Sequence, residues 1–256
     1  MKVHNETLSD VVRYLDSKKN LTLEDMRADY ESYLRVVRQF AGLTPQTRIL
    51  EIGTGTGWFP LLCKLDGLTC KGLEISPQLV EHAHELGRKY GVEPDIELGN
   101  IEECALAADQ FDAIIANSVF EHIERWPNAL QRIHRTLKPG GMFFFISTNK
   151  FSFKSYEYDF PFYGWLPDAW RYRLRVSRQG PDIMKLGIDF NQFTYPGLRR
   201  VFRKTGFSRI YDRVQVMDSS RFSGLKRIAA GVLKTVPPVK GAYLLFTDAT
   251  LFVCIK

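Results

Sequence analysis

A carboxylate followed by three glycines at alternate positions is the feature of the sequence with the clearest chemistry. Glu51 stands two residues before Gly53, and Gly55 and Gly57 complete the run. Glycines have no Cβ, so their backbone N–H groups can approach a ligand closely, while the carboxylate can bind an ammonium group and would repel a pyrophosphate. The dinucleotide fingerprint G-x-G-x-x-G is broken, because Trp58 occupies the place of its third glycine. The run therefore favours a ligand with an amino-acid group over a dinucleotide.

Further polar side chains end the next strand-like segments. Glu74 lies near the end of an apolar segment from Thr69 to Ile75, and Asn117 ends one that starts at Phe111. Ligands of open α/β sheets bind at the carboxyl ends of the strands, so these side chains are expected to converge on one site. A carboxylate can accept hydrogen bonds from both vicinal hydroxyls of a ribose. We assign this role to Glu74, and Ile75 beside it is placed to pack on an adenine ring.

The elements that must position these side chains alternate between strands and helices. Strands are expected at 49–52, 69–75, 94–98, 111–117 and 142–147, with helices at 58–64, from 77 and at 126–137. This alternation predicts a right-handed parallel βαβ array. Helices are also expected over residues 5–41, with a break at 20–23 and Thr22 as the second N-cap. A helix at 195–204, a strand at 207–216, a basic helix at 222–236 and a strand at 243–255 complete the chain.

Five motifs, in this order, resemble those of the class I S-adenosylmethionine-dependent methyltransferases. They are the E-x-G-x-G-x-G run, Glu74, Asn100-Ile101, the segment 117–122 and the L-K-P-G-G run at 137–141. The resemblance implies an α/β fold with a Rossmann-like seven-stranded sheet, helices on both faces and a lid inserted after strand 5. The sheet is then mostly parallel, with the last strand antiparallel between the fifth and sixth. The implied cofactor is S-adenosyl-L-methionine.

The cofactor contacts implied by the resemblance can be assigned residue by residue. Glu51 and the glycines hold the amino-acid end and ribose side, and the segment after strand 4 flanks the methionine end. Asn100 reads the adenine amino group by accepting through its carbonyl oxygen, beside the apolar Ile101. A helix N-cap is the alternative role of Asn100, and both roles can hold together. The full expected set is Glu51, Gly53, Thr54, Gly55, Gly57, Glu74, Ile75, Asn100, Ile101, Asn117, Ser118 and Val119.

Four regions are expected along the chain. They are an N-terminal helical cap (1–47), the cofactor-binding core (48–149), an aromatic and basic lid (150–192) and a C-terminal completion of the same sheet (193–256). The aromatic residues of the lid favour an apolar acceptor pocket with a basic rim, while a structural cap or dimer contact is the alternative. Acceptor-binding candidates are Tyr30, Tyr33, Phe153, Tyr158 and Trp165. For the two tyrosines of the N-terminal cap, helix packing is the favoured role.

His122 is the candidate general base, because it follows the fourth strand and an unperturbed histidine titrates near neutral pH. A structural or cofactor-binding role of the Glu-His pair is favoured over direct catalysis. The segment also resembles the E-x-x-E-H metal set of the ubiquinone-pathway O-methyltransferases, with Glu121 and His122 in its last two places. Ser118 stands in the first place, so one ligand is missing and no metal is expected.

Charge is distributed unevenly along the 256 residues, whose net charge is +6. Residues 1–149 contain 16 Lys and Arg against 21 Asp and Glu, whereas residues 150–256 contain 19 against 8. The basic half suggests an anionic acceptor or an anionic membrane surface; a solvated basic face is an equal alternative. The apolar side of the 222–236 helix is expected to pack on the sheet or lid, with peripheral membrane contact as its alternative.

The cysteine spacing, the apolar runs and one missing motif limit which compartment and which partners are expected. The four cysteines form no C-x-x-C pair and are expected to be reduced core residues. No run resembles a signal peptide or a membrane span, so a cytoplasmic location is expected. Methyltransferases that act on exocyclic base amines usually carry Pro-Pro-aromatic after the polar residue of strand 4. Here Asn117 is followed by Ser-Val-Phe, which disfavours nucleic acid.

The sequence thus predicts an enzyme that transfers a methyl group from S-adenosylmethionine to a small or lipid-linked acceptor. Oxygen is the favoured target atom. Two alternatives remain open. A protein or nucleic-acid methyltransferase is favoured if the basic half forms one open groove. A non-catalytic binding protein with a methyltransferase-like fold is disfavoured by the intact glycines and Glu74.

Overall fold

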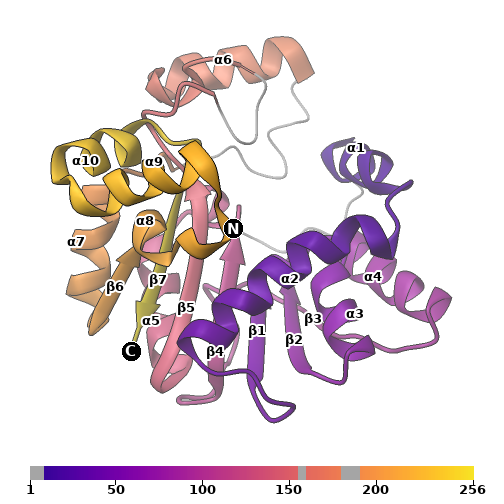
Figure 1. Cartoon of the computed structure of the whole chain (residues 1–256). Coiled ribbons are helices and arrows are strands. Elements are labelled where there is room, and N and C mark those ends of the chain that lie inside the picture. The colour runs from indigo at the N-terminus through magenta and orange to yellow at the C-terminus, as the bar shows by residue number, and fades with distance from the viewer. Residues whose placement is uncertain (1–8, 155–159, 180–190) are drawn as a thin grey trace.

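The computed structural model describes residues 9–154, 160–179 and 191–256, and its centre is one twisted sheet (Figure 1). The strand order is β3-β2-β1-β4-β5-β7-β6. Only β7 runs antiparallel, between β5 and β6, which confirms the expected methyltransferase sheet. The strands are β1 (Arg48–Ile52), β2 (Thr69–Glu74), β3 (Asp95–Leu98), β4 (Phe111–Asn117), β5 (Leu137–Thr148), β6 (Arg209–Asp212) and β7 (Ala249–Ile255).

Helices cover both faces of the sheet. Buried side chains of α2 (Leu23–Phe40) and α3 (Trp58–Leu65) share one core cluster with the sheet, and those of α5 (Trp126–Thr136) and α7 (Tyr195–Thr205) share the other. The remaining helices are α1 (Ser9–Lys18), α4 (Pro77–Lys89), α6 (Asp168–Gln179), α8 (Arg213–Val216), α9 (Gly224–Thr235) and α10 (Pro237–Phe246), with short 3-10 turns η1 (Phe120–His122), η2 (Tyr163–Trp165) and η4 (Ser219–Arg221).

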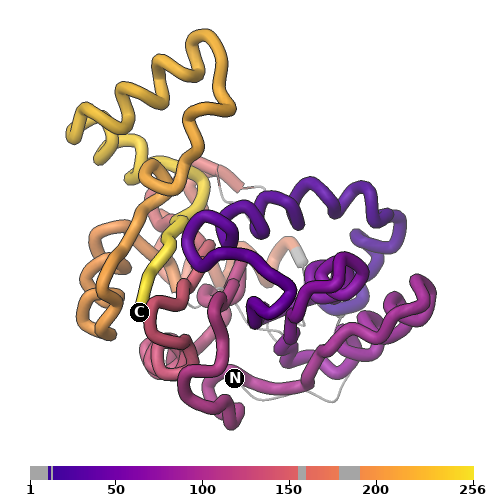
Figure 2. The backbone as a smooth tube through the Cα atoms, turned by 60° about the horizontal axis from the view of Figure 1, so that its bottom comes forward, coloured from indigo at the N-terminus to yellow at the C-terminus, as the bar shows by residue number. Residues whose placement is uncertain are grey.

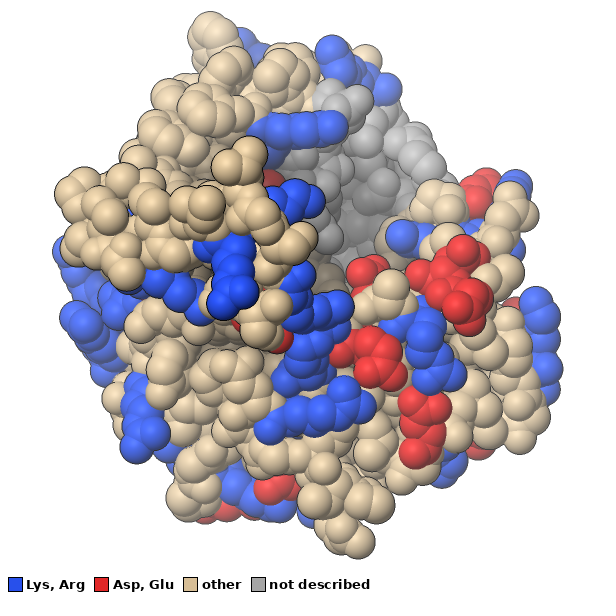
Figure 3. All heavy atoms as spheres, in the orientation of Figure 1, with Lys and Arg blue, Asp and Glu red and all other residues tan. Residues whose placement is uncertain are grey.

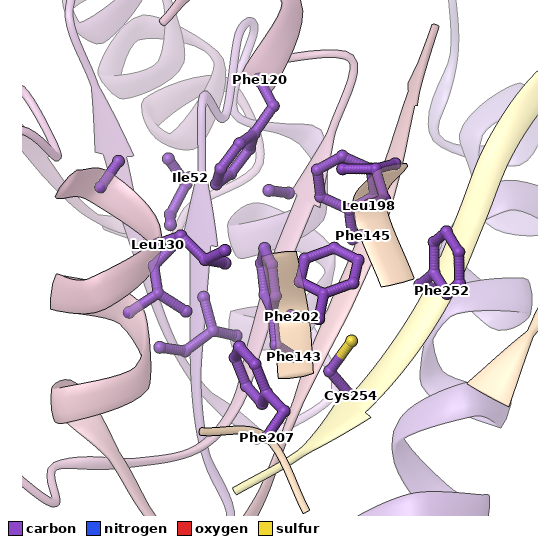
Figure 4. Close-up of a cluster of buried hydrophobic side chains, with 14 of the residues drawn as sticks. Ile52, Phe120, Leu130, Phe143, Phe145, Leu198, Phe202, Phe207, Phe252 and Cys254 are labelled. Carbon is purple, nitrogen blue, oxygen red and sulfur yellow. The ribbon is translucent and has the colours of Figure 1, made fainter. Parts of the chain in front are cut away.

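The central strands divide their side chains between the two cores. On β5, Phe143 and Phe145 enter one cluster, while Met142 and Phe144 enter the other. This alternation follows from the period of two in a strand, and it requires both faces to be covered. Figure 4 shows Phe143 and Phe145 packed with Phe202 of α7 in the first cluster. The cores hold the carboxyl ends of β1, β2 and β4 in fixed positions.

Local sequence signals determine where several helices begin and end. Thr22 and Asp25 form a reciprocal capping box at the start of α2, as the sequence predicts. Ser76 caps α4, with Pro77 at its first position. Thr194 caps α7, and Gly206 ends it in a left-handed conformation.

Three element boundaries differ from the sequence prediction. The L-K-P-G-G run is part of β5 instead of a turn before it, because a register shift between Phe111 and Ala113 accommodates the additional residues. The sixth strand ends at Asp212, which caps α8. Residues 243–246 belong to α10 instead of the last strand. The two prolines after α9 therefore end one helix and start the next.

The predicted packing of the basic helix on the sheet or lid is wrong for most of its apolar side. Within α9, Leu225 and Ile228 are 83% and 65% exposed, while Ala230 is buried. The main contacts of α9 are with α8, η4 and α10. Among the described helices, none is long and apolar enough to cross a bilayer.

Candidate active site

The glycine run forms a tight turn between β1 and α3. Gly53, Gly55 and Gly57 have φ angles of +68°, +57° and +79°, a region that other residues rarely adopt. A Cβ on Gly53 would lie 2.4 Å from Cγ2 of Val119, and one on Gly57 would lie 2.5 Å from Cβ of Ala83. The backbone of the turn therefore requires glycine, and Val119 lies directly against it.

Glu51 is buried at the end of β1. Its carboxylate accepts a hydrogen bond from the Thr54 hydroxyl in the glycine turn. Burial raises the pKa of Glu51 to about 8, and the nearby Glu74 adds to the shift, whereas the Thr54 hydroxyl lowers it. Glu51 is thus largely protonated at neutral pH when no cation is near. A bound ammonium group would favour the ionised form, because it supplies the opposite charge.

Glu74 closes the turn from the neighbouring strand. Its carboxylate accepts the backbone N–H groups of Gly55 at 2.8 Å, Ile75 at 2.9 Å and Ser76 at 3.0 Å. Burial raises the pKa of Glu74, and these three N–H groups oppose the rise. Glu74 therefore holds the glycine turn in place, in addition to its expected role at the ribose.

A pocket opens at the carboxyl ends of β1 to β4, on both sides of the point where the strand order reverses. Such switch points are where open α/β sheets bind ligands. Most of the wall is apolar, which suits the flat faces of a purine. The lining residues are Ile52, Gly53, Leu73, Ile75, Gly99, Asn100, Ile101, Glu102, Val119, His122 and Ile123. The structure thus brings together Gly53, Ile75, Asn100, Ile101, Val119 and His122, which the sequence predicts from four separate motifs.

Asn100 is buried at the pocket, after β3. Its Oδ1 accepts the N–H of Glu102 at 2.9 Å, and its backbone carbonyl accepts the N–H of Cys104 at 2.7 Å. Asn100 therefore caps a turn, although no helix follows it. A carbonyl oxygen has two lone pairs, so this bond is compatible with acceptance from an adenine amino group.

Asn117 is the last residue of β4, and Ser118 follows it. The side-chain amide of Asn117 donates to the Tyr33 hydroxyl at 2.6 Å. Ser118 has φ of +53°, a left-handed conformation that is uncommon for a residue with a side chain. Tyr33 itself packs against Phe59 and Phe144. Of the two expected N-terminal tyrosines, Tyr33 is the one that reaches the carboxyl end of the sheet.

Tyr30 is placed away from that edge. It is buried against Phe59, and its hydroxyl donates to Asp66 after α3 at 2.8 Å. Tyr30 therefore packs between α2 and α3, which is the role that the sequence favours for it. Its acceptor role stays a prediction.

The acceptor candidates in the expected lid, residues 150–192, are only partly described by the structure. Phe153 and Trp165 are half exposed, and both stack on Phe246 at the end of α10. The indole N–H of Trp165 donates to the Ser152 carbonyl at 3.1 Å. Tyr158, the other expected acceptor residue of the lid, lies outside the described residues.

His122 lines the pocket together with Asn100 and Ile101. The preceding Glu121 is 1% exposed, and its carboxylate accepts the Ser147 hydroxyl at 2.6 Å. Glu121 thus connects η1 to β5. In the part of the chain that the structure describes, no three metal-binding side chains are grouped together.

Tyr14 of α1 is a site residue that the sequence did not single out. Its hydroxyl would lie 2.7 Å from a Cβ on Gly55, and it forms a hydrogen bond with Thr56. Burial of the hydroxyl raises the pKa of Tyr14 to about 12, and the charges of Glu74 and Glu51 add to the rise. The residue as a whole is 40% exposed, so Tyr14 reaches from solvent into the turn. Helix α1 therefore covers the glycine run.

Comparison with known proteins agrees with this geometry. Residues 50–145 match the profile of a family described as a methyltransferase domain. A malonyl-[acyl-carrier protein] O-methyltransferase of Erwinia pyrifoliae is 31% identical over 107 residues, 42% of this chain and 39% of that protein. A ubiquinone biosynthesis O-methyltransferase of Methylobacterium nodulans is 29% identical over 102 residues, 40% of this chain and 41% of the relative. The chain spans about two fifths of the length of these curated relatives.

Solved structures show the same fold over most of the chain. A S-adenosylmethionine-dependent methyltransferase of Archaeoglobus fulgidus has a TM-score of 0.58 at 16% identity, covering 95% of this chain and 99% of its own. A phosphoethanolamine N-methyltransferase of Haemonchus contortus has a TM-score of 0.57 at 17% identity, covering 88% of this chain and 52% of its own. That structure contains phosphomonomethylethanolamine and S-adenosylhomocysteine. These comparisons confirm the resemblance to S-adenosylmethionine-dependent methyltransferases.

Proposed function

We propose that this chain, whose residues 50–145 match the profile of a methyltransferase domain, transfers a methyl group from S-adenosylmethionine to a small or lipid-linked acceptor, with oxygen as the target atom. The observation that carries the proposal is the pocket at the switch point. Its walls include residues predicted from the glycine run, the end of β2, the Asn100 turn and the segment after β4. These four motifs are far apart in the sequence and converge on one cavity.

The residues present fit S-adenosylmethionine. Glu51 is a buried carboxylate that the cofactor ammonium would compensate, and the glycine turn leaves its backbone N–H groups without side chains in front of them. We assign the ribose hydroxyls to Glu74 and the adenine to Ile75, Asn100 and Ile101. Asn117, Ser118 and Val119 then flank the methionine end.

The bound cofactor supplies an electrophilic methyl group on a sulfonium. The task of this chain is to hold the acceptor in line with that group, which lowers the barrier mainly by orientation. The Asn117–Tyr33 hydrogen bond fixes the end of β4, beside which the acceptor enters. Trp165 and Phe153 provide apolar surface at the same edge of the sheet, above the end of β5.

Two lines of support bear on the acceptor. The names of the two bacterial relatives state O-methylation, which favours oxygen as the target. Residues 150–256 contain 19 Lys and Arg against 8 Asp and Glu, which favours an anionic acceptor. We further propose that the protein acts in the cytoplasm and meets a lipid-linked acceptor at a membrane surface.

The role of His122 can be decided by experiment. We propose that it contacts the cofactor, because it shares the pocket with Asn100 and Ile101. His122→Gln then weakens S-adenosylmethionine binding and leaves the pH dependence of kcat unchanged. If His122 is instead the general base, the variant binds the cofactor normally and loses the acidic limb of the kcat profile.

Methyl transfer itself is tested with S-adenosylmethionine labelled in its methyl group. We expect label to enter hydrophobic anionic phenols or lipid-linked sugars with the native protein, and not with Glu74→Gln. Glu74→Gln keeps the size of the side chain and so serves as a matched control. If neither class is labelled although the cofactor binds, the proposed acceptor class is wrong.

A further inference from the structure

Helix α9 presents its most apolar side to solvent. Leu225, Ile228 and Val232 recur at the spacing of one helix face, and they are 83%, 65% and 40% exposed. The side that contacts the protein contains the small Ala230 and the half-buried Leu233. An amphipathic helix that only stabilised the fold would have the opposite orientation. Figure 2 shows this segment, in orange, standing out from the rest of the chain.

The exposed apolar surface continues beyond α9. Val236 and Val239 extend it into α10, and Phe246 at the end of α10 adds an aromatic ring. Phe246 stacks on Phe153 with ring centroids 4.8 Å apart and an interplanar angle of 12°. We call Leu225, Ile228, Val232, Val236, Val239 and Phe246 the α9–α10 platform. A group of exposed apolar residues on two helices that pack together marks an interaction site more often than single exposed residues do.

The charged residues within the segment that forms the platform have one sign, although Lys240 among them pairs with Asp212. Between Asp218 and Asp248 the sequence contains five basic residues and no acidic one. Lys226 and Arg227 of α9 are exposed and form no ion pair with any described residue. Figure 3 shows the α9–α10 lobe as a largely uncharged surface with Lys and Arg along its border. Two copies of this basic face would repel each other, whereas an anionic surface would attract it.

The platform is fixed to the carboxyl edge of the sheet. The Asn149 side-chain amide, directly after β5, donates to the carbonyls of Leu244, Leu245 and Thr247 at 3.1, 3.1 and 2.8 Å. Arg213 pairs with Asp248 and also donates to the Thr247 hydroxyl at 2.7 Å. The end of α10 is therefore held at the end of β5, on the same edge of the sheet as the candidate active site.

We propose that the α9–α10 platform binds the surface of an anionic lipid bilayer. Its aliphatic side chains enter the headgroup boundary, and Lys226 and Arg227 contact anionic headgroups. The inference deepens the proposed function and rests on it, because it explains how a lipid-linked acceptor reaches the site. A bilayer is the occupant that offers both apolar volume and negative charge without a fixed shape.

The test is flotation of the full-length protein with vesicles of phosphatidylcholine alone or with 30% phosphatidylglycerol. We expect the native protein to bind the anionic vesicles. This binding should weaken at least tenfold in Leu225→Ser/Ile228→Ser and in Lys226→Gln/Arg227→Gln. The matched control is Leu65→Ser, which removes a leucine that is 38% exposed at the end of α3. It should bind vesicles as the native protein does. Since both platform positions are exposed, folding should be preserved, and thermal unfolding checks this.

Two outcomes would overturn the inference. One is that the native protein does not bind the anionic vesicles, or that the platform variants bind them as strongly as the native protein does. The other is a lipid-free dimer that Leu225→Ser/Ile228→Ser dissociates, which would make the platform an interface between copies. Calorimetric titration with S-adenosylmethionine is run on the same samples. Cofactor binding without vesicle binding refutes the platform alone, whereas vesicle binding without cofactor binding refutes the proposed enzyme.

Discussion

The pKa of Glu51 predicts how cofactor affinity depends on pH. Burial raises this pKa to about 8, so the carboxyl group of the free protein is mostly neutral at pH 7. If the cofactor ammonium binds the ionised carboxylate, the proton must leave on binding. Affinity is then lost as pH falls below the raised pKa, by about tenfold, or 1.4 kcal/mol, for each pH unit.

The assay is isothermal titration calorimetry with S-adenosylmethionine at pH 6 and 7, where the ligand amine is charged. We expect Kd to fall about tenfold from pH 6 to 7, with release of about 0.9 proton per site at pH 7. Buffers with different ionisation enthalpies give the proton count. Glu51→Gln cannot ionise, so it should bind more weakly and show neither the slope nor the proton release.

The same shift has a consequence for stability. The folded pKa lies above the ordinary value of 4.5, so the unfolded chain loses its proton first as pH rises. Without cofactor, Glu51 therefore lowers the free energy of unfolding progressively from about pH 4.5 to about pH 8. Glu51→Gln should unfold at a higher temperature than the native protein at pH 8. The proposed link between Glu51 ionisation and cofactor affinity is refuted if the native Kd is equal at pH 6 and 7. It is also refuted if the Kd of Glu51→Gln depends on pH as the native Kd does.

Three further predictions follow from the same turn. Gly57→Ala should destabilise the fold by about 1–3 kcal/mol more than Gly67→Ala in urea unfolding, because both glycines have positive φ but only the first is crowded; equal losses would contradict this. Glu74→Gln should weaken cofactor binding about hundredfold or more by calorimetry, and Glu74→Ala should also lower the unfolding temperature, because three backbone N–H groups lose their acceptor. Tyr14→Phe should raise the cofactor Kd several-fold at unchanged stability, whereas Tyr30→Phe should cost about 1 kcal/mol of stability at unchanged Kd; the reverse pattern would show that the two tyrosines are wrongly assigned.

The glycine run and Glu74 could be predicted because their signals are local. A short apolar strand, a turn that demands positive φ and a capped helix follow one another within the sequence. Each element is favoured by its own residues. The order of strands around β1 and β4 then follows from the handedness of βαβ connections. This explains why residues from four motifs meet in one pocket as expected. The division of the chain into four regions stays a prediction.

Tyr14 could not be assigned from the sequence, because its position depends on the angle at which α1 crosses the glycine turn. That angle is set by long-range packing. A tyrosine next to the apolar stripe of a helix that precedes the first strand is the only signal present, and it applies equally to Tyr30 and Tyr33. The three differ in what they contact: Tyr14 reaches the glycine turn, Tyr33 the end of β4 and Tyr30 the core beside α3.

The orientation of α9 could not be predicted from the sequence either. Its apolar spacing predicts one buried face, and the sequence alone favours the protein interior for that face. In the structure, the connections through η4 and α10 turn that face outward. The prediction of a strand over 243–255 is wrong at its start for a related reason. Residues 243–246 are apolar and therefore compatible with a strand or a helix, and Pro237 at the first turn favours helix α10.

The most direct test of the account is calorimetric titration of the full chain with S-adenosylmethionine and, separately, with NAD at pH 7.5. We predict micromolar binding of S-adenosylmethionine at one site per chain and no binding of NAD, because Trp58 replaces the third glycine of the dinucleotide fingerprint. Failure of the folded protein to bind S-adenosylmethionine, or binding of NAD at the same site, would contradict the assignment of the pocket.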